Sequence, residues 1–294
     1  MAQSLAPLGA AFLRRLGEAF TRPAARPAPS WPAPPSVPPP VTSPASSPAP
    51  SSPLERQATL IARGLLDPPA DGFIGPLSRW AMAQGEPPPL MPSDDLAGRI
   101  VRALVRRGHF VARHPECLNI VYVEGLNPDG TPNDNAPNRF NDIRCLVRIV
   151  AGVPTLAGCW EATAEPSRRW TFAPMNRSGA ARIAFGQYKA WALGFHHGHE
   201  ALVQVEPLPV YRDARRDFRR EGPIDTGLFG INQHWGYDLP RNDLGNSSAG
   251  CLVGRSIAGH REFMRLVKTD RRFLVAGDGY RFLTAVLPAV DVLT

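Results

Sequence analysis

The sequence is poor in three features that each define a large class of protein. Its 294 residues include four cysteines, too few to hold a chain of this length together as a disulfide scaffold. No apolar run approaches the roughly 18 residues of a membrane span, so we expect no transmembrane segment. Charged residues make up 20% of the chain, which excludes a wholly disordered polyelectrolyte.

The chain is also nearly free of lysine, so its net charge of +7 comes from arginine, with Lys189 and Lys268 as the two exceptions. Together with abundant alanine and proline, this skew indicates a coding bias. The arginines are scattered, whereas a nucleic-acid binder groups them with aromatic residues. The densest group, residues 212–220, alternates with acids and is typical of a solvated segment. We therefore expect no nucleic-acid partner, and an anionic surface such as a cell wall stays open.

Composition divides the chain into four parts. Residues 1–22 have the apolar spacing of an amphipathic docking helix, with a secretory signal or a frayed terminus as alternatives. Residues 23–53 hold 13 prolines and predict a semi-rigid tether, or a docking site for a proline-binding domain. Residues 54–110 are typical of helices, and residues 112–294 of a mainly β domain. The expected fold class is therefore α+β.

A turn-rich segment lies between the apolar helical clusters of residues 54–110. Asp71-Gly72 indicates a turn, Gly75 allows a second bend, and Ser78 is placed to cap or open a helix. Over about 30 residues this order resembles half of the small three-helix peptidoglycan-binding module. It departs from that module where Glu86 is followed by three prolines. A generic helix-turn-helix without a ligand is the alternative.

The larger C-terminal part alternates apolar and polar residues as strands do. Helices are expected over residues 180–192, where Phe185, Tyr188 and Trp191 have helical spacing, and over residues 257–267. Strands are expected over residues 118–124, 144–151, 201–206, 210–212 and 228–232, and the apolar residues 283–288 close this mainly β part.

The most informative segment, residues 225–255, contains a cysteine and a histidine in a suggestive order. Cys251 follows Gly250, and a glycine there lets backbone approach a substrate and frees N–H groups for an oxyanion. A thiol becomes a useful nucleophile when a base or a positive dipole holds it as thiolate. His234, which stands 17 residues upstream, is the expected base. The alternative is that Cys251 is a small buried hydrophobe, as we expect for Cys145.

This segment resembles the catalytic signature of the L,D-transpeptidase (YkuD-type) family. The signature is a His-x-Gly strand end followed by Ser-x-Gly-Cys, and here it reads His234-Trp-Gly236 and Ser248-Ala-Gly250-Cys251. The preceding Thr226-Gly-Leu-Phe-Gly resembles the family's Thr-Pro-x-Gly-x-Phe strand without its proline. The resemblance covers about residues 200–265 and implies a β-sandwich-like fold.

The resemblance also implies a role for each matching residue. Cys251 is the expected nucleophile on a peptidoglycan stem-peptide carbonyl, and His234 is the expected general base and later acid. Gly250 and the N–H of Cys251 are expected to hold the oxyanion, and Ser248 to position the loop. The acyl-enzyme then passes to an amine or to water, so the expected enzyme is a cysteine acyltransferase or a peptidoglycan hydrolase.

Two positions depart from the family pattern. Ala249 replaces a histidine, and Val253 replaces an arginine that binds a substrate carboxylate or orders the loop. Arg255 stands two residues further on, and we expect it to contact the substrate. We also expect Trp235 and Gly236, which follow the expected base, to contact the substrate. A degenerate binding domain is the alternative.

A second histidine-rich segment, residues 196–200, offers a different chemistry. In a strand, His197 and His199 would face one side, as in zinc peptidases that cut peptidoglycan. His234 or Asp225 would supply a third ligand. The alternative, a polar turn before the next strand, is the one we favour, so no metal and no cofactor are expected.

These observations predict a protein directed at the bacterial cell wall. A tether that joins a binding module to a catalyst raises the concentration of catalyst at a polymeric substrate. Peptidoglycan is the expected partner, and the expected location is the cell wall or periplasm, or delivery by a phage. A noncatalytic wall-binding or virion-associated protein and a zinc-dependent wall hydrolase are the alternatives.

Overall fold

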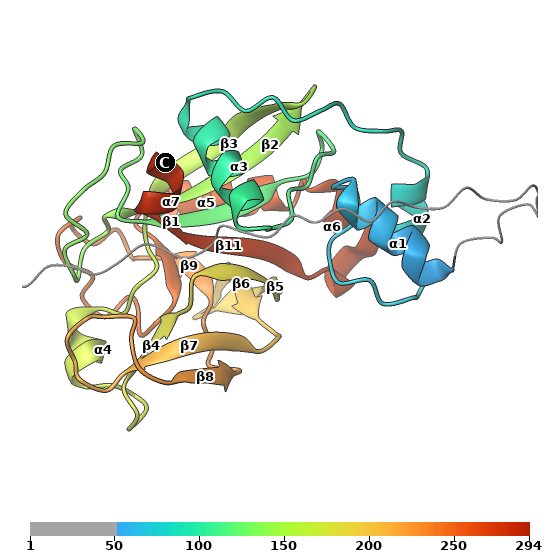
Figure 1. Ribbon diagram of the computed structural model, residues 1–294. Coiled ribbons are helices and arrows are strands. Elements are labelled where there is room, and N and C mark those ends of the chain that lie inside the picture. The colour runs from blue at the N-terminus through green and yellow to red at the C-terminus, as the bar shows by residue number, and fades with distance from the viewer. Residues whose placement is uncertain (1–51) are drawn as a thin grey trace, which may run out of the picture. The chain divides into compact units, whose positions relative to one another are not determined.

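The computed structural model describes residues 52–294, which belong to one compact unit (Figure 1). The helix expected over residues 1–22, and all but the end of the linker expected over residues 23–53, lie outside the described residues. Within the described part, helices accompany a closed eight-stranded barrel and a separate three-stranded sheet, so an α+β fold is confirmed. No helix of residues 52–294 is long and apolar enough to cross a membrane.

The barrel has the spatial strand order β1-β11-β5-β6-β9-β10-β3-β2. Two neighbouring pairs, β1 with β11 and β9 with β10, run parallel, and the other neighbours run antiparallel. The family resemblance implies a β-sandwich-like fold, but the main sheet closes on itself. The strands are Asn119–Glu124 (β1), Asp142–Val150 (β2), Val153–Thr163 (β3), Gly186–His196 (β5), His199–Gln204 (β6), Gln233–Trp235 (β9), Leu252–Gly254 (β10) and Phe282–Pro288 (β11).

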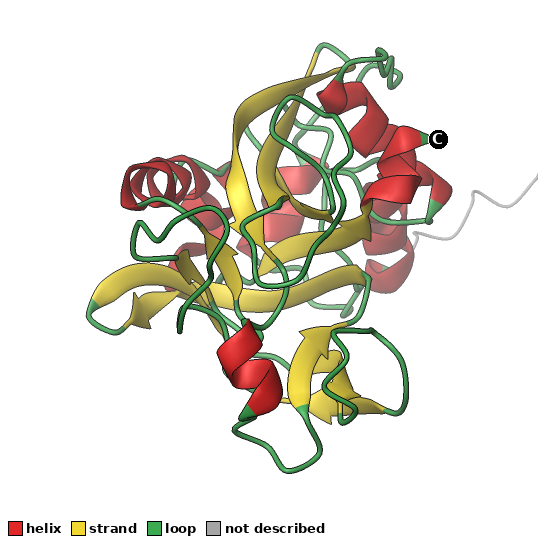
Figure 2. Ribbon diagram, turned by 90° about the vertical axis from the view of Figure 1, so that its left-hand side faces the viewer, coloured by secondary structure: helices red, strands yellow, loops and turns green. Residues whose placement is uncertain are grey.

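The small sheet lies to one side of the barrel, with the short helix α4 (Arg168–Phe172) beside it (Figures 1 and 2). Its antiparallel order is β4-β7-β8. Arg182 on β4 is fully buried and pairs with Glu165, which follows β3, at 2.5 Å and with Asp213 on β7 at 3.4 Å. Because breaking a buried ion pair is costly, these contacts fix the sheet against the barrel. The strands are Ala180–Ile183 (β4), Leu208–Asp213 (β7) and Ile224–Gly227 (β8).

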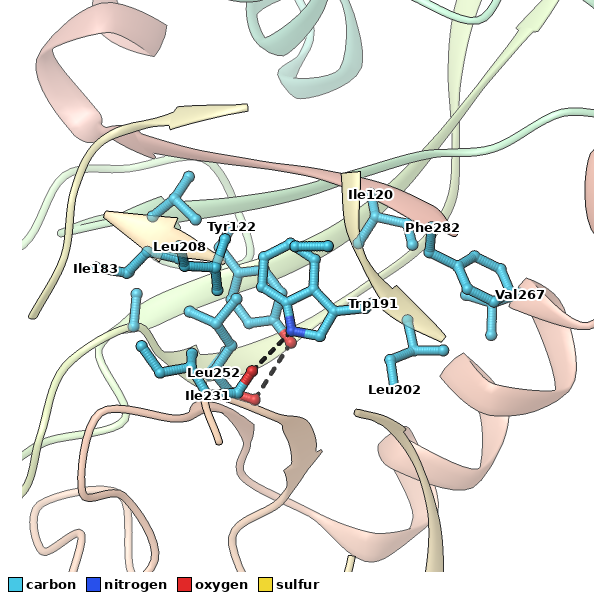
Figure 3. Packing of buried hydrophobic residues seen from close by; sticks show 14 of the residues in the cluster. Ile120, Tyr122, Ile183, Trp191, Leu202, Leu208, Ile231, Leu252, Val267 and Phe282 are labelled. Carbon is cyan, nitrogen blue, oxygen red and sulfur yellow. Dashed lines mark hydrogen bonds between the residues drawn. The ribbon is translucent and has the colours of Figure 1, made fainter. Parts of the chain in front are cut away.

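The main core cluster is built from apolar side chains around Trp191 (Figure 3). The indole Nε1 of Trp191 donates a hydrogen bond to the carbonyl of Ile231 at 2.8 Å. The hydroxyl of Tyr122 donates a longer bond to the carbonyl of Leu252 at 3.5 Å. These carbonyls belong to the two segments that carry His234 and Cys251, so the core holds the backbone of both.

The helices cover the barrel from outside. The expected helix over residues 257–267 is confirmed as α5 (Ile257–Val267). On α3, which is capped by Asp95, Ile100 and Leu104 pack against outward-facing residues of β1 and β2 such as Val121. The first two helices share a separate small apolar cluster, so the expected module over residues 54–110 contributes to two clusters. The other helices are α1 (Pro53–Ala62), α2 (Pro76–Met82), α3 (Leu96–Arg106), α6 (Arg271–Ala276), the 3₁₀ turn Gly277–Gly279 and α7 (Ala289–Leu293).

The turn between α1 and α2 is built around the buried side chain of Gln57. Its Nε2 donates to the carboxylate of Asp71 at 2.7 Å, and its Oε1 accepts from the N–H of Gly72 at 2.7 Å. Ser78, expected to cap or open the second helix, is buried inside α2 and accepts from the same amide at 3.1 Å. Gly75 is the N-cap instead, because Pro76 follows it and already has the backbone angle of a first helical residue.

The helix expected over residues 180–192 is wrong, because β4 and β5 occupy this segment. Phe185, Tyr188 and Trp191 do have helical spacing, but pairing with neighbouring strands overrides a local pattern. Trp191 faces the barrel core, whereas the Tyr188 hydroxyl turns back to the carbonyl of Ala184 at 2.9 Å.

The strand expected over residues 228–232 is also wrong, because this segment is an irregular loop. The side-chain oxygen Oε1 of Gln204 accepts the N–H groups of Phe229 at 3.0 Å and Ile231 at 2.9 Å, in place of a neighbouring strand. Between them Gly230 has a φ of 71°, which glycine adopts without strain. The strands expected over residues 118–124, 144–151, 201–206 and 210–212 are confirmed within a few residues, and the closing apolar residues 283–288 belong to β11.

Candidate functional site

The barrel brings Cys251 and His234 to neighbouring strands. Cys251 directly precedes β10, which pairs in parallel with β9, and Val253 is the register partner of His234. The N–H of Leu252 donates to the carbonyl of Asn232 at 2.9 Å. The 16 residues between the histidine and the cysteine therefore leave the sheet after one strand and return to it beside that strand.

The imidazole of His234 is almost completely buried, with 2% of its surface exposed. Its Nδ1 lies 2.8 Å from the carbonyl oxygen of Trp235, and since a carbonyl only accepts, Nδ1 carries the proton. Its Nε2 has no hydrogen-bond partner within the described residues. Burial, helped by the neighbouring His196, lowers the pKa of His234 to about 3. The ring is therefore neutral at neutral pH, and Nε2 is a free proton acceptor.

His196 from the end of β5 stacks on His234, with ring centroids 4.2 Å apart and an interplanar angle of 23°. Its Nδ1 lies 3.0 Å from the side-chain nitrogen of Asn232. The side-chain oxygen of Asn232 accepts the N–H of Gln204, so the amide nitrogen donates and His196 Nδ1 accepts. This arrangement fixes one face of His234, whose buried Nε2 is unpaired in a ring that lines the cavity.

The thiol of Cys251 is partly exposed, and its sulfur lies 3.4 Å from the carbonyl of Gly230, to which it donates. Burial raises the pKa of this thiol to about 11, although a hydrogen bond from the Asn232 backbone works in the opposite direction. At neutral pH the site therefore holds a neutral thiol beside a neutral imidazole. A reaction of this thiol requires a base in the same step, which is what a free imidazole nitrogen supplies.

Ser248 and Gly250 shape the loop before the cysteine. The fully buried Ser248 hydroxyl donates to the carbonyl of Cys251 at 2.9 Å and accepts the N–H of Gly250 at 3.2 Å. Gly250 has a φ of 133°, and a Cβ there would lie 2.6 Å from the carbonyl oxygen of Ala181. The N–H of Gly250 is thus already used, whereas that of Cys251 has no acceptor among residues 52–294. The Cys251 N–H is therefore the oxyanion donor that this loop leaves available.

Cys251, His234 and Gly250 line one cavity of about 530 Å³, within the range of small-molecule sites. One wall comes from the barrel and the loop before β10, and the facing wall comes from β4 and β7 of the small sheet. Trp170, Tyr237 and Met175 contribute apolar surface. The described residues that line it include no Asp, Glu or Lys, and one arginine, Arg212.

Three residues expected to contact the substrate lie outside this cavity. Arg255 pairs with Glu161 at 2.5 Å. Trp235 points to the other side of β9, where its ring packs 4.0 Å from that of His199 and borders a second cavity of about 250 Å³. Gly236 faces Phe140, which a Cβ would meet at 2.4 Å, and its N–H donates to the carbonyl of Gly254.

The histidine-rich segment does not assemble the alternative zinc site. It forms the hairpin between β5 and β6, with His197 in the turn at a φ of 48°. His197 lines the main cavity, whereas His199 borders the second one. Among the described residues, no group of three or more His, Cys, Asp or Glu side chains is placed to hold a metal ion.

Sequence reasoning missed three residues of the site: His196, Asn232 and Arg212. His196 was assigned to a zinc site or a turn, and Arg212 to a solvated charged segment. Both ends of residues 212–220 are in fact largely buried, since Arg212 is 6% exposed and Arg220 pairs with the buried Glu124. Alternation along residues 208–213 is the one signal that pointed to a buried Arg212.

Fold and cavity together define a mixed β-barrel protein with a cysteine–histidine pair in an open cavity. The sequence matches no protein-family model and no curated protein at a significant level.

Proposed function

We propose that this protein is a cysteine acyltransferase of the L,D-transpeptidase type that acts on peptidoglycan stem peptides. One observation carries the proposal: His234, with its unpartnered Nε2, and Cys251 line one cavity, His234 on β9 and Cys251 directly before β10, which pairs with β9 in parallel. The sequence motif His234-Trp-Gly236 with Ser248-Ala-Gly250-Cys251 supports the same assignment.

The proposed reaction begins with the neutral pair. As Cys251 Sγ forms a bond to the donor carbonyl carbon, its proton passes to His234 Nε2. Nδ1 keeps its own proton and goes on donating it to the Trp235 carbonyl, which stabilises the imidazolium that forms. The tetrahedral intermediate then breaks its C–N bond, and Nε2 returns the proton to the leaving amine. An incoming amine or water reverses these steps and frees the thiol.

The loop before β10 supplies the electrostatic part of the proposal. The N–H of Cys251 points its dipole at the developing oxyanion, and the buried Ser248 hydroxyl fixes the peptide planes on either side. A single oxyanion donor is worth about 10²–10³ in rate. Gly250 contributes by its missing side chain and not by its N–H group.

The N-terminal residues complete the proposal. We assign the helical segment 54–110 to wall binding, with the cell wall or periplasm, or a phage particle, as the location. A small cavity of about 230 Å³ lies between α2 and the barrel, bordered by Asp71 and Lys189. It is the place where a wall fragment would bind.

Intact-mass spectrometry after exposure to a carbapenem tests the proposed chemistry. Opening of the lactam ring by Cys251 adds the whole reagent, because the proton leaves the thiol and returns to the ring nitrogen. We expect a single adduct on the wild-type protein, none on Cys251→Ala, and slow formation on His234→Ala. Absence of an adduct, with Cys251 also inert to iodoacetamide in the folded protein, would contradict the proposal and favour a noncatalytic wall-binding protein.

A further inference from the structure

Arg212 on β7 is held rigidly at the wall of the Cys251 cavity. Its Nε and Nη2 both donate to one carboxylate oxygen of Asp225, at 3.0 and 2.8 Å, and its guanidinium carbon lies 4.4 Å from the ring centroid of Phe229. Its Nη1 has no acceptor among the described residues. The guanidinium is therefore fixed on one edge and free to donate on the other.

The two partners of this ion pair differ in exposure. The Arg212 side chain is 6% exposed, whereas that of Asp225 is 47% exposed. Water and salt screen the exposed carboxylate much more than the buried cation. The described lining of the cavity contains one arginine and no Asp or Glu, and this charge pattern favours an anionic ligand group.

One loop connects this cation to the nucleophile. Phe229 lies under the Arg212 guanidinium, and the next residue, Gly230, accepts the thiol of Cys251 at 3.4 Å. The side chain of Gln204 holds the same loop through two hydrogen bonds. A donor with its carbonyl at the sulfur can thus present a second group to the guanidinium within one rigid frame.

The two positions from which an arginine was expected cannot supply this cation. Val253 is fully buried in an apolar cluster with Phe140 and Leu244. Arg255 is paired with Glu161 outside the cavity. Among the described residues that line the cavity, Arg212 is the remaining permanent cation.

We infer that Arg212 is a carboxylate-binding residue, and that the acyl donors of this enzyme carry a free carboxylate close to the carbonyl that Cys251 attacks. This inference rests on the proposed acyl-transfer function and adds the charge class of its substrate. Arginine suits the role because its planar fork matches carboxylate geometry and never deprotonates. Arg212 is a specificity-determining residue and takes no part in proton transfer.

The test compares a carbapenem, which bears a carboxylate, with its methyl ester, which carries the same reactive ring without that charge. Rates of Cys251 acylation are measured by intact mass for the wild type, Arg212→Gln and Arg212→Lys. Arg215→Gln serves as the matched control, since this arginine of the same segment is 78% exposed. We expect Arg212→Gln to slow the acid by about tenfold or more and to leave the ester unchanged, because a hydrogen bond between charged groups is lost.

Each outcome has a defined meaning. The lysine variant is expected to keep more of the acid-to-ester ratio than the glutamine variant, and Arg215→Gln to keep all of it. Equal slowing of acid and ester in Arg212→Gln would make Arg212 a structural residue, and unchanged rates with both reagents would show that it has no role. Either result overturns this inference and leaves the proposed function standing. Failure of both reagents on wild-type Cys251 would overturn the proposed function and this inference with it.

Discussion

Two buried histidines, one on each side of strand β9, have similarly lowered pKa values but different hydrogen bonds. His234 faces the main cavity, and His260 on α5 packs on the other side near Trp235, at 6.0 Å between ring centroids. Burial lowers the pKa of both imidazoles to about 3. Yet His260 donates from Nε2 to the carbonyl of Glu200 and accepts from Arg144 at Nδ1, whereas Nε2 of His234 is free.

The two rings differ in their hydrogen bonds, not in their pKa values. A perturbed pKa reports burial, which both rings share. A ring that uses both nitrogens ties elements together, as His260 ties α5 to β6 and β2. A ring that uses one nitrogen has a second nitrogen left for a substrate or nucleophile. Substitution of each histidine separately tests this difference.

The largest expected effect is on the rate of Cys251 acylation. His234→Gln should slow carbapenem acylation by about 10²–10⁴-fold, the range for loss of a general base. His260→Ala should leave the rate of the folded fraction unchanged, because His260 lies outside the cavity. Intact-mass time courses, normalised to folded protein by circular dichroism, measure both. Equal rates for His234→Gln and wild type would remove the distinction between the two faces.

The opposite ranking is expected for stability. His260→Ala should reduce the free energy of unfolding by about 2–4 kcal/mol, because it leaves a buried Arg144 nitrogen and the Glu200 carbonyl without partners. His234→Gln removes one hydrogen bond and should cost about 1 kcal/mol. Urea denaturation at pH 7 gives both values. A larger loss for His234→Gln would contradict the structural role given to His260.

A smaller effect on stability and acylation is expected from substitution of Gly250, which lines the cavity. Gly250→Ala should cost about 1–3 kcal/mol, because its φ of 133° is strained for alanine and its Cβ would meet the Ala181 carbonyl. Gly108→Ala is the matched control, since Gly108 also has a positive φ, of 67°, but nothing lies within 4 Å of its Cβ position. Thermal unfolding should separate the two variants, and acylation should slow only in Gly250→Ala. Equal behaviour of both would make the Ala181 contact unimportant.

The pH dependence of stability gives the finest comparison. The folded-state pKa of His234 is about 3 and its ordinary value is 6.5, so between these values the unfolded chain binds a proton that the folded chain excludes. Stability due to the neutral ring is therefore complete above pH 6.5 and is lost as the pH falls toward 3, by at most about 1.4 kcal/mol per pH unit. His234→Gln should lose less stability than wild type between pH 7 and pH 5 in urea titrations. Parallel losses would show that His234 is protonated in the folded state.

The sequence predicted that Cys251 and His234 belong to one site, and it predicted most strands, because both leave local signals. Residues 118–124 and 144–151 alternate as strands do, and the Gly250-Cys251 pair stands at a motif spacing from His234. The error over residues 180–192 came from aromatic residues whose helical spacing is incidental to strand pairing. The error over residues 228–232 came from β-like composition in a segment that a distant glutamine, Gln204, holds as a loop.

The rest of the site depends on contacts between elements far apart in the chain. Arg212 and Phe229 come together through pairing of β7 with β8 and the loop that follows. His196 meets His234 through closure of β6 onto β9. Neither contact has a periodicity or a motif, so a single sequence carries no direct sign of it.

The place of β11 in the barrel has a consequence for how the protein is made. This strand, residues Phe282–Pro288, lies between β1 and β5 and pairs with both, although more than 150 residues separate it from β1. A chain emerging from the ribosome can form the β1-β2-β3 meander early, but the gap beside β1 stays open until β11 is synthesised. Such long-range closure is slow. The barrel that positions Cys251 therefore cannot close before residues 282–288 have been synthesised.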